Sequence, residues 1–178
     1  IMKKVLLSAA LLLSSVAMFA QHEVGTLTIQ PKAGLNIANV TKVDGKARVD
    51  FVGGAELEYQ VDDIISLSGG LLYSRQGYKA KDGDGKWAPS YLNVPVLANV
   101  YPVEGLAVKL GVQPGFMIDK DKADDAKTFD LSIPVGLSYE YSNFVIDGRY
   151  NFGVTKVSKN ISAKNSVFQI TVGYKFEL

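Results

Sequence analysis

Apolar and polar side chains alternate with a period of two along most of this 178-residue chain. Successive side chains of a strand point to opposite faces, so this alternation indicates strands with one apolar and one polar face. The most apolar segment, 91–118, is no membrane helix, because Pro95, Pro102 and Pro114 and many polar residues interrupt it. Parity predicts eight strands, at 27–39, 51–61, 64–77, 91–100, 108–118, 129–140, 144–152 and 168–178.

The predicted connections alternate between short and long. Short turns fall at 61–64, 102–105 and 141–143, and long polar loops fall at 40–50, 79–90, 119–128 and 155–165. This pattern is typical of outer-membrane barrels, whose turns are periplasmic and whose loops are extracellular. About eleven residues per strand, rising roughly 3.3 Å each at a tilt of about 40°, give a height on the order of 27 Å, which suits the lipid. The expected fold is all-β, an eight-stranded antiparallel up-and-down transmembrane β-barrel.

Residues 1–20 are predicted to be a cleaved signal peptide, and 21–178 the barrel domain. Lys3 and Lys4 precede an apolar run, 5–19, which is too short to span a membrane comfortably. Without this leader the chain has 17 basic residues (19 − 2) against 18 acidic ones. Because there is no positive excess, nucleic acid is not expected as a partner.

Alternation alone is compatible with two kinds of barrel. A membrane barrel has its apolar side chains outside, whereas a soluble ligand-binding barrel has them inside. The membrane barrel is favoured because the polar positions of several strands carry few charges, and because aromatic residues at apolar positions fall near strand ends. We expect a turn-side aromatic girdle of Tyr59, Tyr139, Phe144, Tyr174 and Phe176, and a loop-side girdle of Phe51, Tyr73, Phe116, Phe129, Phe152 and Phe168.

Charged residues at the polar positions are expected to meet inside the barrel, in its turn-side half. Equal numbers of each sign suit burial, because an unpaired ion in the lumen is costly. A structural plug is the favoured interpretation, since side chains fill an eight-stranded barrel, and a proton or ion path is the alternative. The predicted luminal network is Lys32, Lys109, Arg149, Lys175, Glu56, Glu58, Glu140 and Asp147.

Two further features shape the expectations. Pro95, Pro114 and Pro134 fall in mid-strand, where each lacks a ladder donor, so bulges or breaks in pairing are expected there. His22 is the only histidine and is expected in a solvated tail, and the chain has no cysteine. The usual nucleophilic and metal-binding sets are therefore missing, and no enzyme activity, cofactor or metal is expected.

The segments "KAGLNIAN", "YLNVPVLANVYP", "GVQPGF" and "ITVGYKFEL" resemble porin-family outer-membrane β-barrel proteins that are abundant in Bacteroidetes. This resemblance implies export to the outer membrane of a Gram-negative bacterium. It also implies insertion by the barrel-assembly machinery, which often recognises a terminal aromatic residue in that family. Here the chain ends Phe176-Glu177-Leu178.

A structural or surface-interaction role is the favoured function. The barrel is expected to contact outer-membrane lipid and lipopolysaccharide, and its long loops could bind an unknown extracellular partner. Two alternatives stay open from the sequence. One is porin-like passive transport of small solutes or ions, and the other is a soluble periplasmic ligand-binding barrel.

Overall fold

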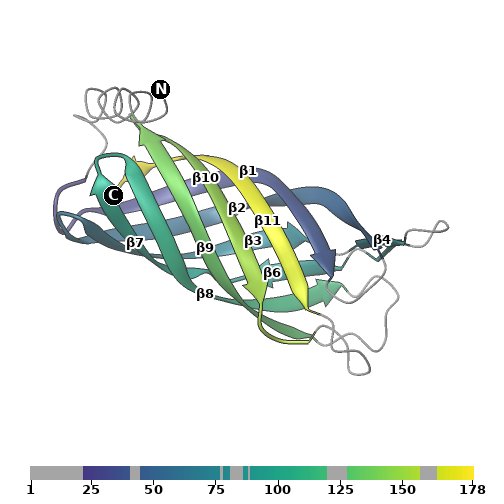
Figure 1. The fold of residues 1–178 in the computed structure, drawn as a ribbon. Helices are drawn as coiled ribbons and strands as arrows, with labels where there is room; N and C mark the ends of the chain where they lie inside the picture. Colours follow the sequence, from purple (N-terminus) through teal and green to yellow (C-terminus); the bar gives the residue numbers. More distant parts are fainter. Residues whose placement is uncertain are drawn as a thin grey trace, which may run out of the picture.

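The computed structural model describes residues 22–40, 45–76, 78–80, 86–87, 89–119, 128–156 and 164–178. The predicted signal peptide and part of each predicted loop lie outside these residues. Within them, one antiparallel sheet of 12 strands closes on itself (Figure 1). None of the described residues belongs to a helix with the length and hydropathy that crossing a bilayer requires.

Eight strands form the barrel wall, each antiparallel to its neighbours, and two of them are interrupted and so carry two labels each. Strand β1 pairs with both β2 and β11, and this double pairing closes the barrel. The predicted eight-stranded up-and-down barrel is therefore confirmed. The wall strands are β1 (Leu27–Val40), β2 (Gly45–Asp62), β3 (Ile65–Arg75), β6 (Ser90–Asn93) with β7 (Val96–Val103), β8 (Leu106–Asp119), β9 (Phe129–Tyr141), β10 (Phe144–Gly153), and β11 (Asn165–Tyr174) with β12 (Phe176–Glu177).

A small sheet extends the barrel on the loop side. The start of β2 pairs with β4 (Tyr78–Ala80), and β4 pairs with β5 (Lys86–Trp87). In Figure 1 this extension lies at the end of the barrel remote from the C-terminus. The sequence assigned 45–50 and parts of 79–90 to loops, which is wrong. Alternation reveals strands with one face in lipid, so it misses strand segments that continue beyond the apolar band.

Breaks in strand pairing occur at the prolines, as predicted. Pro95 lies between the end of β6 and the start of β7. Pro114 of β8 is opposite that break, where its carbonyl oxygen accepts the Val94 amide at 2.8 Å. Pro134 of β9 lies within a gap in the pairing of β8 with β9. The register is the same on both sides of each gap, so these are breaks rather than bulges.

The strands are strongly staggered around the barrel. A circuit of paired residues that leaves β1 at Asn36 returns to Thr26, the residue before β1, which is ten residues (36 − 26) nearer the turn-side rim. Side chains at one height are therefore offset by little more than one residue from each strand to the next. The circuit runs through Asn36, Gln169, Arg149, Gly136, Lys109, Asn99, Ser66 and Gln60.

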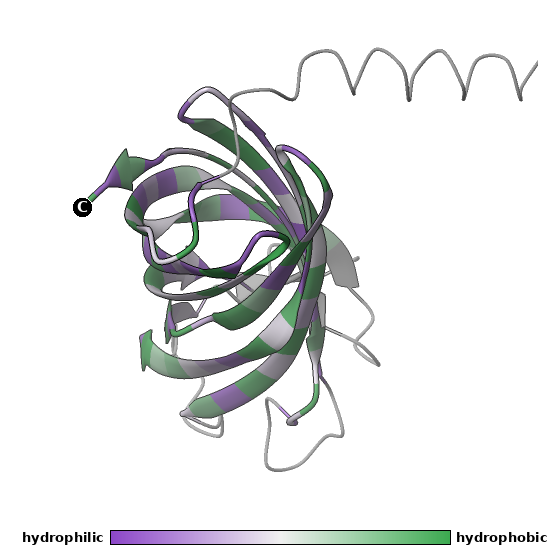
Figure 2. Cartoon of the chain, turned by 90° about the vertical axis from the view of Figure 1, so that its left-hand side faces the viewer, coloured by the Kyte–Doolittle hydropathy of each residue, from purple (hydrophilic) through white to green (hydrophobic). Residues whose placement is uncertain are grey.

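The apolar face of the barrel lies outside. Leu35, Leu110 and Leu137 expose 54%, 55% and 54% of their surface, whereas their neighbours Asn36 and Lys109 are buried. Figure 2, which looks towards the turn-side end, shows hydrophilic and hydrophobic residues alternating along the strands. A soluble barrel would bury its apolar face instead, so this arrangement contradicts the soluble alternative.

Candidate functional site

All eight predicted luminal charges lie inside the barrel, and each is at most 5% exposed. The structure divides them into two groups that the sequence did not separate. The central cluster consists of Lys32, Glu56, Lys109, Asp147 and Arg149. The turn-side cluster consists of Glu58, Glu140 and Lys175.

Asp147 of β10 is the hub of the central cluster. Its Oδ2 atom lies 3.0 Å from Lys109 Nζ on β8 and 3.3 Å from Lys32 Nζ on β1. Arg149, two residues further along β10, donates from Nε to Oδ1 at 2.9 Å and from a terminal nitrogen to Oδ2 at 2.7 Å. One fully buried carboxylate thus contacts three cations, each of which would be costly to bury alone.

Arg149 also links β10 to β2 across the interior. Its two terminal nitrogens donate to the Glu56 carboxylate at 2.9 and 3.3 Å, in the bidentate geometry that suits a guanidinium. Gly136 and Gly70 leave room for these two side chains. A Cβ atom on Gly136 would lie 2.7 Å from Arg149 Cβ, and one on Gly70 would lie 2.5 Å from Glu56 Cγ. Glycine at both positions therefore permits the bridge.

Lys175 is the centre of the turn-side cluster, just beyond the end of β11. Its Nζ atom lies 2.7 Å from Glu140 on β9 and 2.9 Å from Glu58 on β2. The Tyr101 hydroxyl of β7 donates to Glu58, and Ser66 Oγ donates to the same carboxylate at 2.6 Å. These contacts come from strands around the barrel, so the cluster fills the turn-side end of the lumen.

His22 adds a further contact at this end. Its Nε2 atom lies 2.9 Å from Glu140 Oε1, and its side chain is 16% exposed. The sequence predicted that His22 would lie in a solvated tail, and this prediction is wrong. The segment after His22 is held against β2, because the Gly25 amide donates to Gln60 O at 2.8 Å and the Gln60 amide donates to Thr26 O at 2.9 Å. This tertiary anchoring brings His22 over the mouth of the lumen.

The two clusters are complementary in charge. The central cluster has three cations and two carboxylates, an excess of +1, and the turn-side cluster has one cation and two carboxylates, an excess of −1. The eight residues together are neutral, as their burial requires. Within the described part of the chain, no group of three or more His, Cys, Asp and Glu residues could hold a metal ion.

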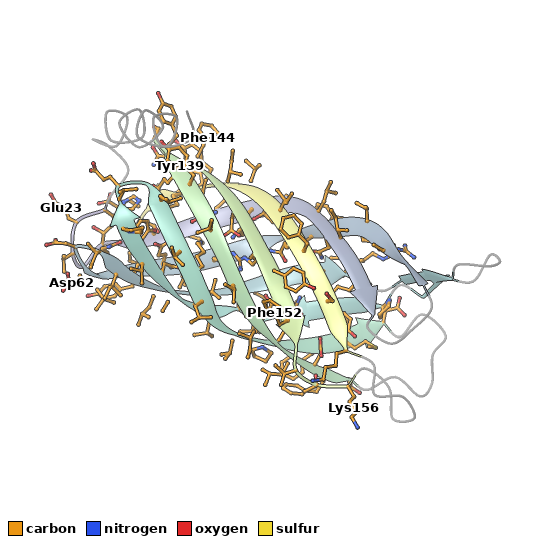
Figure 3. The ribbon with its side chains drawn as sticks, viewed as in Figure 1. Glu23, Asp62, Tyr139, Phe144, Phe152 and Lys156 are labelled. Atoms are coloured by element: carbon orange, nitrogen blue, oxygen red, sulfur yellow. The ribbon has the colours of Figure 1, made fainter. Side chains whose placement is uncertain are left out.

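The eleven predicted girdle residues all lie on the outward face. In Figure 3, Phe144 lies towards the turn-side end, where Glu23 and Asp62 also lie, whereas Phe152 and Lys156 lie towards the other end. Ring contacts join aromatic residues within each of the two girdles. Phe144 and Tyr174 have centroids 5.0 Å apart on the turn side, and Phe116 and Phe129 have centroids 5.6 Å apart on the loop side.

Three polar features of the lumen were not predicted from the sequence. Tyr101 shares the parity of Asn99, which was expected to face inward, so the signal for Tyr101 was available. Arg48 forms an ion pair with Asp50 in a segment that was assigned to a loop. His22 had no local signal, because its contact with Glu140 joins residues far apart in the chain.

A closed barrel with an apolar outside and an ion-paired interior is an integral membrane β-barrel. The chain belongs to the family of the outer membrane protein beta-barrel domain, whose model matches residues 6–176. This family places the protein in the outer membrane of Gram-negative bacteria. Assignment to Bacteroidetes stays a prediction from the sequence.

Two solved structures illustrate the similarity of fold. Neisserial surface protein A is 16% identical, with a TM-score of 0.57 and coverage of 84% of this chain and 97% of that one. Ail, the attachment invasion locus protein of Yersinia pestis, is 19% identical, with a TM-score of 0.53 and coverage of 86% of this chain and 100% of that one. Comparison with curated proteins gives no match.

Proposed function

We propose that the protein is a non-conducting outer-membrane barrel with a structural or surface-interaction role, and that it has no enzymatic activity. The observation that carries this proposal is the pair of buried charge clusters. The central cluster joins β1, β2, β8 and β10, and the turn-side cluster joins β2, β9 and the end of β11. Cross-links in so many directions leave little room for a continuous aqueous path in an eight-stranded barrel.

The energetics of the clusters support a structural role. A hydrated ion that passed this level would have to displace salt bridges of 2.7–3.3 Å between side chains that are at most 5% exposed. Breaking a buried ion pair leaves uncompensated charge, which costs about 3–5 kcal/mol per pair. In the porin-like alternative, solutes or ions would need a path around these ion pairs or a transient opening of them.

The loop-side end supports a surface-interaction role. The sheet of β2, β4 and β5 extends the barrel beyond its apolar band on that side. Of the two similar barrels, one is named a surface protein and the other an attachment invasion locus protein. We propose that the loop-side end contacts lipopolysaccharide or an extracellular partner, and that the predicted leader, 1–20, directs export.

Conductance across a planar lipid bilayer tests the proposal. The purified barrel is expected to give no large, steady conductance, and proteoliposomes that contain it should not swell in small sugars. A steady large conductance, or swelling that depends on sugar size, would support the porin-like alternative instead. Protease cleavage within 79–90 and 119–128 on intact cells tests separately whether these segments are extracellular.

A further inference from the structure

A band of uncharged carboxamides lines the lumen on the loop side of the central cluster. Asn36 of β1 and Gln169 of β11 are paired residues, and Asn151 of β10 is one inward position beyond the partner of Gln169. Gln113 of β8 completes the band on the far side of β9. It pairs with Ser132 of β9, and Asn151 pairs with Pro134, which is the next inward residue of that strand. With the stagger of the barrel, these four residues, the carboxamide band, lie at nearly one height.

The band is buried but poorly satisfied. Its members are 0–3% exposed. Five of their polar atoms have no hydrogen-bond partner among the described residues, namely Asn36 Oδ1, Gln113 Oε1, both side-chain atoms of Asn151, and Gln169 Nε2. Buried polar atoms in folded proteins are nearly always hydrogen-bonded to protein, water or a ligand. Five in one band, three acceptors and two donors, therefore indicate a common hydrogen-bonding ligand.

The surroundings of the band define the ligand's chemistry. Below it, every guanidinium nitrogen of Arg149 donates to Glu56 or Asp147, so Arg149 is already fully compensated. Towards the loops lie the buried apolar side chains Ala38, Met117 and Val167. The charged side chains there already have polar partners, because Arg48 pairs with Asp50 and Asp130 accepts a hydrogen bond from Thr155 Oγ1 at 2.6 Å. The ligand should therefore be small and neutral, and it should both donate and accept hydrogen bonds.

We propose that the carboxamide band binds a cluster of water molecules or a small neutral polyol in the loop-side half of the lumen. A buried water typically needs two to four polar partners, and the unpaired amide atoms supply partners of both kinds. The site goes beyond the proposed function, because a non-conducting barrel needs the charge clusters but not this band. It can therefore fail without affecting that proposal.

Nuclear magnetic resonance of protein with 15N-labelled Asn and Gln side chains, in lipid nanodiscs, tests the site. We expect cross-relaxation from water to the carboxamide protons of Asn151 and Gln169, or saturable shifts of these signals when glycerol is titrated. Asn99 is the matched control for the amide protons, because its Nδ2 atom already donates to Ser66 at 3.0 Å and Ser68 at 3.2 Å, and only its Oδ1 atom has no partner among the described residues. Water contacts alone assign water, and saturable glycerol shifts assign a polyol. The absence of both effects overturns the proposal.

The sign of a stability change gives an independent test. Asn151→Leu keeps the approximate size of the side chain but removes both polar atoms. If these atoms bind a ligand, the variant should unfold at a lower urea concentration than the wild type. If they are merely buried without partners, their removal is stabilising and the midpoint rises, which would contradict the proposal. Gln169→Leu provides the same comparison if Asn151→Leu does not fold.

Discussion

Asp147→Asn removes one negative charge from the central cluster while it keeps the size of the side chain. Asp147 contacts all three cations of that cluster. The positive excess therefore rises from +1 (3 − 2) to +2 (3 − 1). Lys109 is affected most, because its Nζ atom lies 3.0 Å from Asp147 and the described residues provide it with no other ion pair.

The expected loss is large for a single isosteric substitution. Lys109 is 2% exposed, so it cannot recover its hydration in the folded barrel. Removal of one partner of a buried ion pair costs about 3–5 kcal/mol, and we expect a loss of unfolding free energy in this range. Adding Lys109→Met returns the excess to +1 (2 − 1) and should recover about 2 kcal/mol of the loss.

Urea unfolding of the four proteins in phospholipid vesicles, followed by circular dichroism, measures these differences. The single variant Lys109→Met should lose less than Asp147→Asn, because Asp147 keeps Lys32 and Arg149 as partners. Two results would refute the reasoning. One is an Asp147→Asn barrel as stable as the wild type, and the other is a double variant that is less stable than Asp147→Asn.

Three further substitutions, with Gly148→Ala as a control for the first, probe the wall, the lipid face and the turn-side mouth by the same urea assay. Gly136→Ala should lose about 1–3 kcal/mol, because the new Cβ would lie 2.5 Å from Gly148 O, whereas Gly148→Ala meets nothing within 4 Å and should be tolerated. Leu110→Arg should lose about 2–4 kcal/mol in vesicles, since this side chain faces lipid near mid-height, and an unchanged stability would argue against that placement. His22→Ala removes the 2.9 Å contact with Glu140. The unfolding free energy should fall by at most about 1 kcal/mol, because the histidine keeps some solvent contact. A larger fall would mean that the N-terminal segment stabilises the barrel more than this one contact suggests.

The prolines show how far local reasoning extended. A missing amide donor predicts an interruption wherever a proline falls inside a ladder. That argument located the break at Pro95 and the gap at Pro134. It did not reveal that Pro95 and Pro114 share one gap, because that depends on which residues of β8 lie opposite the break.

The boundaries of β2 show where the sequence signal ends. Strand β2 begins at Gly45, although alternation indicated a start near Phe51. Its first residues pair with β4, so hydrogen bonds to another strand define them as a strand. For this reason the sequence assigned to loops some residues that the structure places in strands.

The sequence by itself determined the face on which each side chain lies. Leu35 faces lipid and Asn36 faces the lumen because successive residues of any strand point in opposite directions, which is a local property of the backbone. Only the tertiary structure decided which luminal charges meet. Glu56 and Glu58 are two residues apart on one strand, yet Glu56 binds Arg149 and Glu58 binds Lys175. Their partners follow from the ten-residue stagger of the closed barrel, which is set by hydrogen bonds between distant strands and leaves no periodic trace in the chain.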